Sequence, residues 1–168
     1  LLAGSIFQGT NSFFRITEDY SRYYPHRPWL TFAFNISTGV QFEVGDTRGI
    51  PIYERFYAGG DQSVRGYREQ ELSPMRDDKP IGGNMKAVFR VESRFQVYKE
   101  LHAALFFDSG NAWSDVGLNN LPGIRSSVGM GIRYETPIGV ARLDYGLKLN
   151  KRPGESSGQF HLTLGQAL

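Results

Sequence analysis

The stretch "WLTFAFNISTGVQFEV", residues 29–44, alternates apolar and polar side chains along most of its length. A period of two residues indicates a β-strand. At about 3.3 Å per residue the stretch spans roughly 50 Å, about twice the length of a usual strand. One face of this strand is apolar, and the other carries small or polar side chains and lacks the large apolar residues of a soluble core. The apolar face consists of Leu30, Phe32, Phe34, Ile36, Val40 and Phe42.

The same asymmetry recurs in later stretches, at residues 84–95, 127–135, 141–149 and 159–165. Their polar faces mix charges of both signs with glycine, and their apolar faces carry aromatic residues near the strand ends. Alternation of this kind with aromatic girdles is typical of transmembrane β-barrels. The alternative is a soluble antiparallel sheet with one face in water. The aromatic residues near the ends are Trp29, Tyr98, Trp113 and Tyr134.

Eight antiparallel strands are expected. Tight turns at 98–100 and 136–139 alternate with longer polar loops at 114–123 and 150–157, which is the arrangement of outer-membrane barrels. The predicted fold class is therefore all-β, an antiparallel transmembrane β-barrel. The expected strands are residues 1–9, 12–24, 29–45, 82–98, 101–113, 124–136, 138–149 and 158–167.

Composition excludes several function classes. The chain has 19 basic and 17 acidic residues, which is too even a balance to indicate a nucleic-acid partner. It has no cysteine, so disulfides and thiolate chemistry are excluded. The histidines, His26, His102 and His161, are scattered, and no metal-binding or nucleophile spacing occurs. We therefore predict no enzymatic activity, no metal site and no cofactor.

Residues 46–80 connect two expected strands and are far longer than a usual hairpin loop of about 2 to 5 residues. Their apolar and aromatic content predicts an ordered, packed segment. Arg65 lies at the centre of this loop, and its planar fork of donors suits a carboxylate. The inward strand faces offer two acids, Glu92 and Asp108. The alternative is a solvated Arg65, and Asp61 is interpreted as a turn-former beside Gly60.

The segment "GGDQSVRGY", residues 59–67, resembles the signature loop of the outer-membrane assembly and translocation factors of the BamA and TamA type. Further motifs of that family resemble residues 82–84, 106–113, 134–146 and 158–168, so the match covers about residues 50–168 in order. The TamA branch is preferred because the chain ends in Leu168. The signature residues are Gly59, Gly60, Asp61, Val64, Arg65, Gly66 and Tyr67.

This resemblance implies a sixteen-stranded barrel preceded by periplasmic POTRA domains, with residues 1–168 as its C-terminal half. It also implies that the loop folds into the lumen, where Arg65 contacts Glu92 and Asp108. The first and last strands would meet at a weak seam that opens towards lipid. The closing strand would contribute Phe160, Leu162, Leu164 and Leu168 to that seam.

The size of the loop also favours a larger barrel on physical grounds. An eight-stranded barrel is only wide enough for its own side chains, so it has no room for the loop. Eight strands of a larger barrel would leave an open edge, whose unpaired backbone groups are costly in lipid. The chain begins without Met and is expected to be a piece of a longer precursor; alone, it could self-associate to cover its edge.

The function implied by the resemblance is insertion or translocation of proteins at the outer membrane of a Gram-negative-type bacterium. The expected partners are membrane lipid, nascent outer-membrane proteins and a periplasmic or inner-membrane accessory protein. One alternative is a pore that secretes a single dedicated protein. Another is a ligand-binding β-barrel, which would need a more apolar interior than these charged, glycine-rich faces provide.

Overall fold

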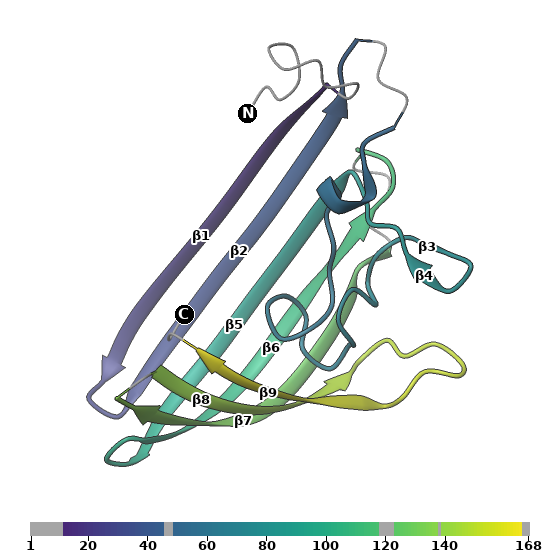
Figure 1. Cartoon of the computed structure of the whole chain (residues 1–168). Coiled ribbons are helices and arrows are strands. Elements are labelled where there is room, and N and C mark those ends of the chain that lie inside the picture. The colour runs from purple at the N-terminus through teal and green to yellow at the C-terminus, as the bar shows by residue number, and fades with distance from the viewer. Residues whose placement is uncertain (1–11, 46–48, 118–122, 138, 166–168) are drawn as a thin grey trace.

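The computed structural model describes residues 12–45, 49–117, 123–137 and 139–165. In these ranges seven long antiparallel strands form one curved sheet (Figure 1). Each strand pairs with the next long strand along the chain. In sheet order the strands are β1 (Phe13–Arg27), β2 (Leu30–Glu43), β5 (Met85–Tyr98), β6 (Leu101–Trp113), β7 (Arg125–Thr136), β8 (Gly139–Lys148) and β9 (Gly158–Gly165).

The all-β, antiparallel prediction is confirmed, with local differences at the strand ends. The expected strand at residues 1–9 lies outside the described residues. β1 continues to Arg27 instead of ending at residue 24, and the register shifts between Pro25 and Arg27. Proline has no N–H to donate, which suits an irregularity of this kind. β5 begins at Met85 rather than residue 82, because Gly83 pairs with Phe56 of the loop.

The two faces of the sheet have opposite chemistry. The convex face exposes large apolar side chains, including Ile36, Leu105, Met130, Leu143 and Leu162. The concave face buries polar and charged groups, which is the reverse of a soluble sheet and matches strands that turn their apolar face to lipid. The buried charged residues of the strands are Arg90, Glu92, Asp108, Arg125, Arg133, Arg142, Asp144 and Lys148.

The aromatic residues near the strand ends follow the prediction in three of four cases. Trp29, Tyr98 and Tyr134 are exposed. Trp113 is buried, so its assignment to an exposed girdle was wrong. Gly123, just before β7, lies against the indole: a Cβ added there would lie 3.1 Å from Trp113 Nε1.

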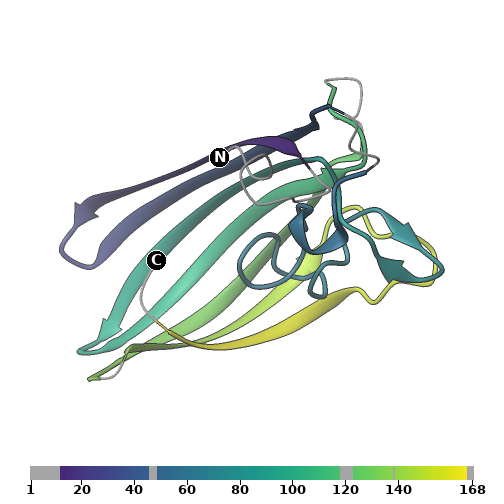
Figure 2. The same cartoon turned by 45° about the horizontal axis from the view of Figure 1, so that its top comes forward.

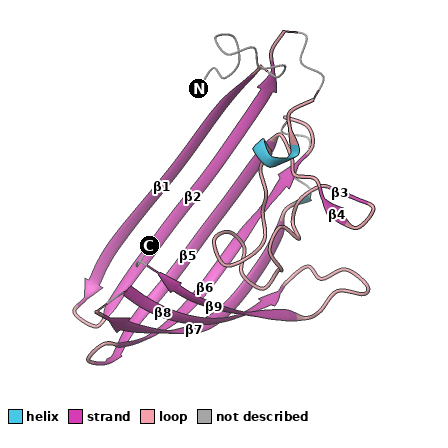
Figure 3. Ribbon diagram, in the orientation of Figure 1, coloured by secondary structure: helices cyan, strands magenta, loops and turns pink. Residues whose placement is uncertain are grey.

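The long segment between β2 and β5 lies in the hollow of the sheet in both views (Figures 1 and 2). It contains one short 3-10 helix, Ile52–Glu54, and a small hairpin of β3 (Met75–Arg76) and β4 (Lys79–Pro80) (Figure 3). Within the described part of the chain, no helix is long and apolar enough to cross a membrane. An apolar cluster joins the loop to β5 and β6 and consists of Ala58, Val64, Tyr67, Leu72, Val88 and Ala112.

The opposite chemistry of the two faces gives a direct test. Met130 is exposed on the convex face at the middle of β7. Thr17 of β1 lies on the concave face, because it is two residues from Arg15, whose side chain contacts Gln41 and the loop. Met130→Arg is expected to lower the free energy of unfolding by about 2–4 kcal/mol, because it places a charge at the membrane midplane. Thr17→Arg is expected to cost less than about 1 kcal/mol. Urea unfolding of the full-length protein in lipid vesicles measures both; equal losses would contradict the assignment of the faces.

Candidate functional site

The strand register brings the inward charges into adjacent rows. One row runs from Arg90 through Asp108 and Ser127 to Lys148 across β5, β6, β7 and β8. The next row carries Glu92, and the row beyond that carries Asp144. Three carboxylates from three strands therefore surround one region of the concave face.

Arg65 occupies that region. Its Nε and Nη2 donate to the two oxygens of Asp108 at 2.7 and 2.9 Å, and its backbone N–H donates to the same carboxylate at 3.1 Å. Nη1 donates to Glu92 at 2.5 Å and to Asp144 at 3.4 Å. Arg65 is 4% exposed and Asp108 is fully buried. The alternative of a solvated loop arginine is thus wrong, and the structure places Arg65 against both expected acids.

The charge cluster is larger than the three residues expected from the sequence. Arg133 of β7 donates to Glu92 at 3.0 Å and to Asp144 at 2.5 Å. Arg94 of β5 donates to the second oxygen of Glu92 at 2.8 Å. Three arginines and three carboxylates therefore alternate, and each acid contacts at least one arginine. Asp144, Arg133 and Arg94 lie on the inward faces read from the sequence, but no role was assigned to them there.

Phe106 forms the floor beneath the arginine, and sequence reasoning missed it. The guanidinium carbon of Arg65 lies 3.6 Å from the centre of the buried Phe106 ring, a cation–π geometry. Phe106 lies two residues before Asp108, so the alternation of β6 places both side chains on the inward face. That alternation is the sequence signal that could have identified Phe106. Its partner on β7 is Gly129, where an added Cβ would lie 2.3 Å from the ring. Gly131 similarly leaves space for the Asp144 carboxylate.

Burying this many charges is stable only because they are paired. An isolated buried guanidinium would be costly, and removal of one partner from a buried pair typically costs about 3–5 kcal/mol. Burial by itself lowers the pKa of Arg65, but the hydrogen bond and charge of Asp108, helped by Glu92 and Asp144, raise that pKa above its ordinary value. The arginine therefore stays charged inside the hollow.

The loop reaches Asp108 because two glycines allow its backbone to approach closely. Gly59 has a φ of +100°, and an added Cβ there would lie 2.5 Å from the Arg68 carbonyl oxygen. Gly66 has a φ of +89°, and a Cβ would lie 3.0 Å from the backbone of Gly146 on β8. Both φ values lie in the region that favours glycine. Gly60, beside Gly59, also has a positive φ.

The apolar residues of the signature pack beside the arginine. Val64 and Tyr67 are both fully buried. The Tyr67 hydroxyl lies 3.2 Å from the Ser126 carbonyl oxygen and 3.0 Å from Asn150 Oδ1, either of which can accept its proton. The Tyr67 ring also lies beneath the Nζ of Lys148, which is 4.7 Å from the ring centre. The signature thus anchors the loop to β7 and β8 as well as to the acids.

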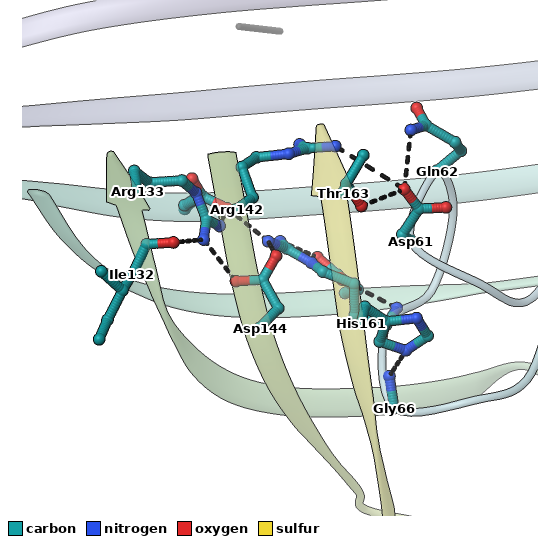
Figure 4. Close-up of polar contacts among 12 residues, drawn as sticks. Asp61, Gln62, Gly66, Ile132, Arg133, Arg142, Asp144, His161 and Thr163 are labelled. Carbon is teal, nitrogen blue, oxygen red and sulfur yellow. Dashed lines mark hydrogen bonds and ion pairs between the residues drawn. The ribbon is translucent and has the colours of Figure 1, made fainter. Parts of the chain in front are cut away.

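The loop also contacts β9 (Figure 4). Thr163 donates to Asp61 at 2.8 Å, and the backbone N–H of Gly66 donates to His161 Nε2 at 3.0 Å. Asp61 further accepts from Gln62 at 2.9 Å and lies 3.8 Å from Arg142. The interpretation of Asp61 as only a turn-former was therefore incomplete. The sequence gives no sign of the His161 contact, because 95 residues separate His161 from Gly66.

The expected seam residues lie on the outer face of β9. Phe160, Leu162 and Leu164 are among the most exposed apolar side chains, with Leu162 at 77%. Leu168 lies outside the described residues. His102 Nδ1 lies 3.8 Å from a Glu135 carboxylate oxygen. Among the described residues, no group of three or more His, Asp or Glu side chains could hold a metal ion.

Comparison with known proteins identifies the family. The Omp85 superfamily domain matches residues 2–168. The chain belongs to the Omp85 superfamily. The outer membrane protein assembly factor BamA of Nitratidesulfovibrio vulgaris is 33% identical over 94% of the chain and 21% of that protein. BamA of Neisseria meningitidis is 26% identical over 91% of the chain and 24% of that protein. The chain therefore spans about a quarter or less of these relatives.

A solved structure gives the same fold. The crystal structure of BamA from Haemophilus ducreyi lacking POTRA domains 1–3 superimposes with a TM-score of 0.72, at 20% identity, over 95% of this chain and 39% of that one. Together with the apolar convex face, the family membership confirms that the chain is an integral outer-membrane protein of a Gram-negative-type bacterium. The preference for the TamA branch of the Omp85 superfamily stays a prediction.

The contact between Gly66 and β8 predicts a steep cost for a single methyl group. Gly66→Ala is expected to lower the free energy of unfolding by about 2 kcal/mol or more, because alanine disfavours this φ and its Cβ meets the Gly146 backbone. Gly117→Ala is the matched control: a Cβ there has no neighbour within 4 Å, and its cost is expected within about 0.5 kcal/mol. Thermal unfolding of both variants in detergent measures the difference. Equal stabilities would contradict the close packing of the loop on β8.

Proposed function

We propose that this chain is the C-terminal half of the transmembrane barrel of an outer-membrane protein assembly factor. In this proposal the sheet closes with further strands of the same protein into a barrel of about sixteen strands. Periplasmic POTRA domains precede that barrel. The observation that carries the proposal is the charge cluster around Arg65, which fastens a long loop inside a curved sheet whose outer face is apolar.

Lipid supplies the physical reason for closure. Unpaired strand edges leave backbone N–H and C=O groups unsatisfied, at several kcal/mol each in a bilayer. Among the described residues, β1 and β9 pair on one side only. They therefore need further strands or, in the isolated chain, a second copy. A closed barrel would turn the concave face into a lumen around the loop.

β9 is the proposed lip of a seam that opens towards lipid. An incoming strand of a nascent outer-membrane protein adds to it by backbone hydrogen bonds, which are tolerant of sequence. The outward side chains Phe160, Leu162 and Leu164 stay in contact with lipid while the backbone edge becomes available.

The loop braces the lumen and sets how easily the seam opens. Its arginine is tied to β5, β6 and β8 at once, so the curvature of the sheet beside β9 depends on the cluster. This role requires neither catalysis nor a cofactor, in keeping with relatives named as assembly factors. The partners in this proposal are membrane lipid, unfolded outer-membrane proteins and an accessory protein on the periplasmic side.

Replacement of Arg65 tests the bracing role. Arg65→Ala leaves Asp108 and Glu92 without their main partner and is expected to loosen the barrel and impair assembly. Arg65→Lys is expected to rescue little, because an ammonium cannot make the bidentate contact to Asp108. The measurements are heat-modifiable mobility of the full-length protein and the cellular levels of other outer-membrane proteins.

The matched control is Arg68→Ala, since Arg68 lies in the same loop and is exposed. This variant is expected to behave as the unaltered protein in both measurements. Normal mobility together with normal outer-membrane protein levels in Arg65→Ala would rule out the bracing role.

A further inference from the structure

The two contacts between the loop and β9 fall at consecutive inward positions of that strand. Thr163 donates to Asp61, and His161 accepts from the backbone N–H of Gly66 (Figure 4). In the described part of the chain these are the polar contacts that β9 makes beyond its ladder with β8. Because Nε2 of His161 accepts, the ring is neutral with its proton on Nδ1.

The loop reaches β9 by passing over β8. Gly66 and Gly146 lie backbone to backbone, and a Cβ on Gly146 would lie 2.5 Å from the Gly66 nitrogen. Gly146 pairs with Gln159 of β9, so the crossing lies directly beside the edge strand. Arg65 precedes Gly66 and is held by the acids of β5, β6 and β8. The position of Gly66 relative to His161 is therefore fixed by the charge cluster.

On the outer side, β9 is held weakly. Phe160 packs against Tyr145 with ring centres 4.4 Å apart and ring planes tilted by 40°, but Leu162 and Leu164 are exposed. The inner side thus carries the specific contacts, one at each of two neighbouring inward residues. A strand held by one ladder and two inward contacts can be released by breaking the inward contacts first.

From this placement we infer that Asp61 and the Gly66 N–H form a latch on His161 and Thr163, and that release of this latch frees β9 for opening of the seam. The inference rests on the proposed function, since it names the residues that regulate the proposed lip. The latch residues are positioning residues: they act on β9 and touch no substrate. The charge cluster holds the loop in place, and the latch transmits that hold to the edge strand.

Amide hydrogen exchange tests the latch without reference to assembly. Asp61→Ala leaves the sequence of β9 unaltered, and Thr163→Val removes the donor while keeping the shape of the side chain. Each variant of the full-length protein is expected to show about fivefold faster exchange in β9, as the loss of one or two hydrogen bonds implies, with exchange in β6 unchanged. Thr31→Val, on the inward face of β2 and away from the loop, is the control. Unchanged exchange of β9 in both latch variants would overturn the inference.

Reversible cross-linking tests the coupling to seam opening, and the chain is suited to it because it contains no cysteine. A short thiol cross-linker across Asp61→Cys and Thr163→Cys ties the loop to β9. The same reagent across Glu71→Cys and Lys148→Cys ties the same loop to β8, because these two side chains are 2.5 Å apart. Each cross-linked protein is compared with the same protein after the cross-link is cleaved. We expect the first cross-link to lower assembly at least tenfold relative to its cleaved form, and the second to give the same assembly before and after cleavage.

The two experiments separate the two claims. Loss of assembly with both cross-links would show that general movement of the loop matters, which overturns the latch on β9. Faster exchange of β9 together with full assembly in both cross-linked proteins would support the latch contacts and overturn the proposed opening at β9.

Discussion

A buried guanidinium constrains the rest of this structure. Arg65 leaves water only because Asp108 binds it through two side-chain hydrogen bonds and Glu92 and Asp144 share the remaining charge. Those acids come from three strands, so their meeting requires the observed register and curvature of the sheet. The loop and the concave face of the sheet therefore depend on each other. Removal of a charged side chain from one of them leaves a buried charge on the other without its partner.

The need to make room for the buried arginine also explains the glycines on the inward faces of β7 and β8. Space for the arginine and its aromatic floor exists because β7 and β8 carry Gly129, Gly131 and Gly146 where side chains would otherwise stand. Glycine normally weakens a strand, so its use here marks close approach of another group. The repeated small residues of the inward faces, which first indicated a lumen, are the surface on which the loop rests.

Much of the fold could be predicted from the sequence, because alternation is local and places Glu92 and Asp108 on the inward side. The rest depended on register and on the strand ends. Register selects Asp144 as the third acid of Arg65, and no local pattern states which inward residues share a region. Trp113 is buried with Gly123 beside its indole, a contact from outside the strand that the alternation of β6 does not describe. His161 is 95 residues from Gly66 in sequence, so their contact required the assembled sheet.

Arg65 and Asp108 act as one coupled pair that holds the loop on the sheet. A double-mutant cycle with Arg65→Ala, Asp108→Ala and the double variant measures that coupling as a difference in the free energy of unfolding. We expect a coupling energy of about 2 kcal/mol or more, because each single variant leaves a buried charge without its main partner. Effects that add within about 0.5 kcal/mol would contradict it.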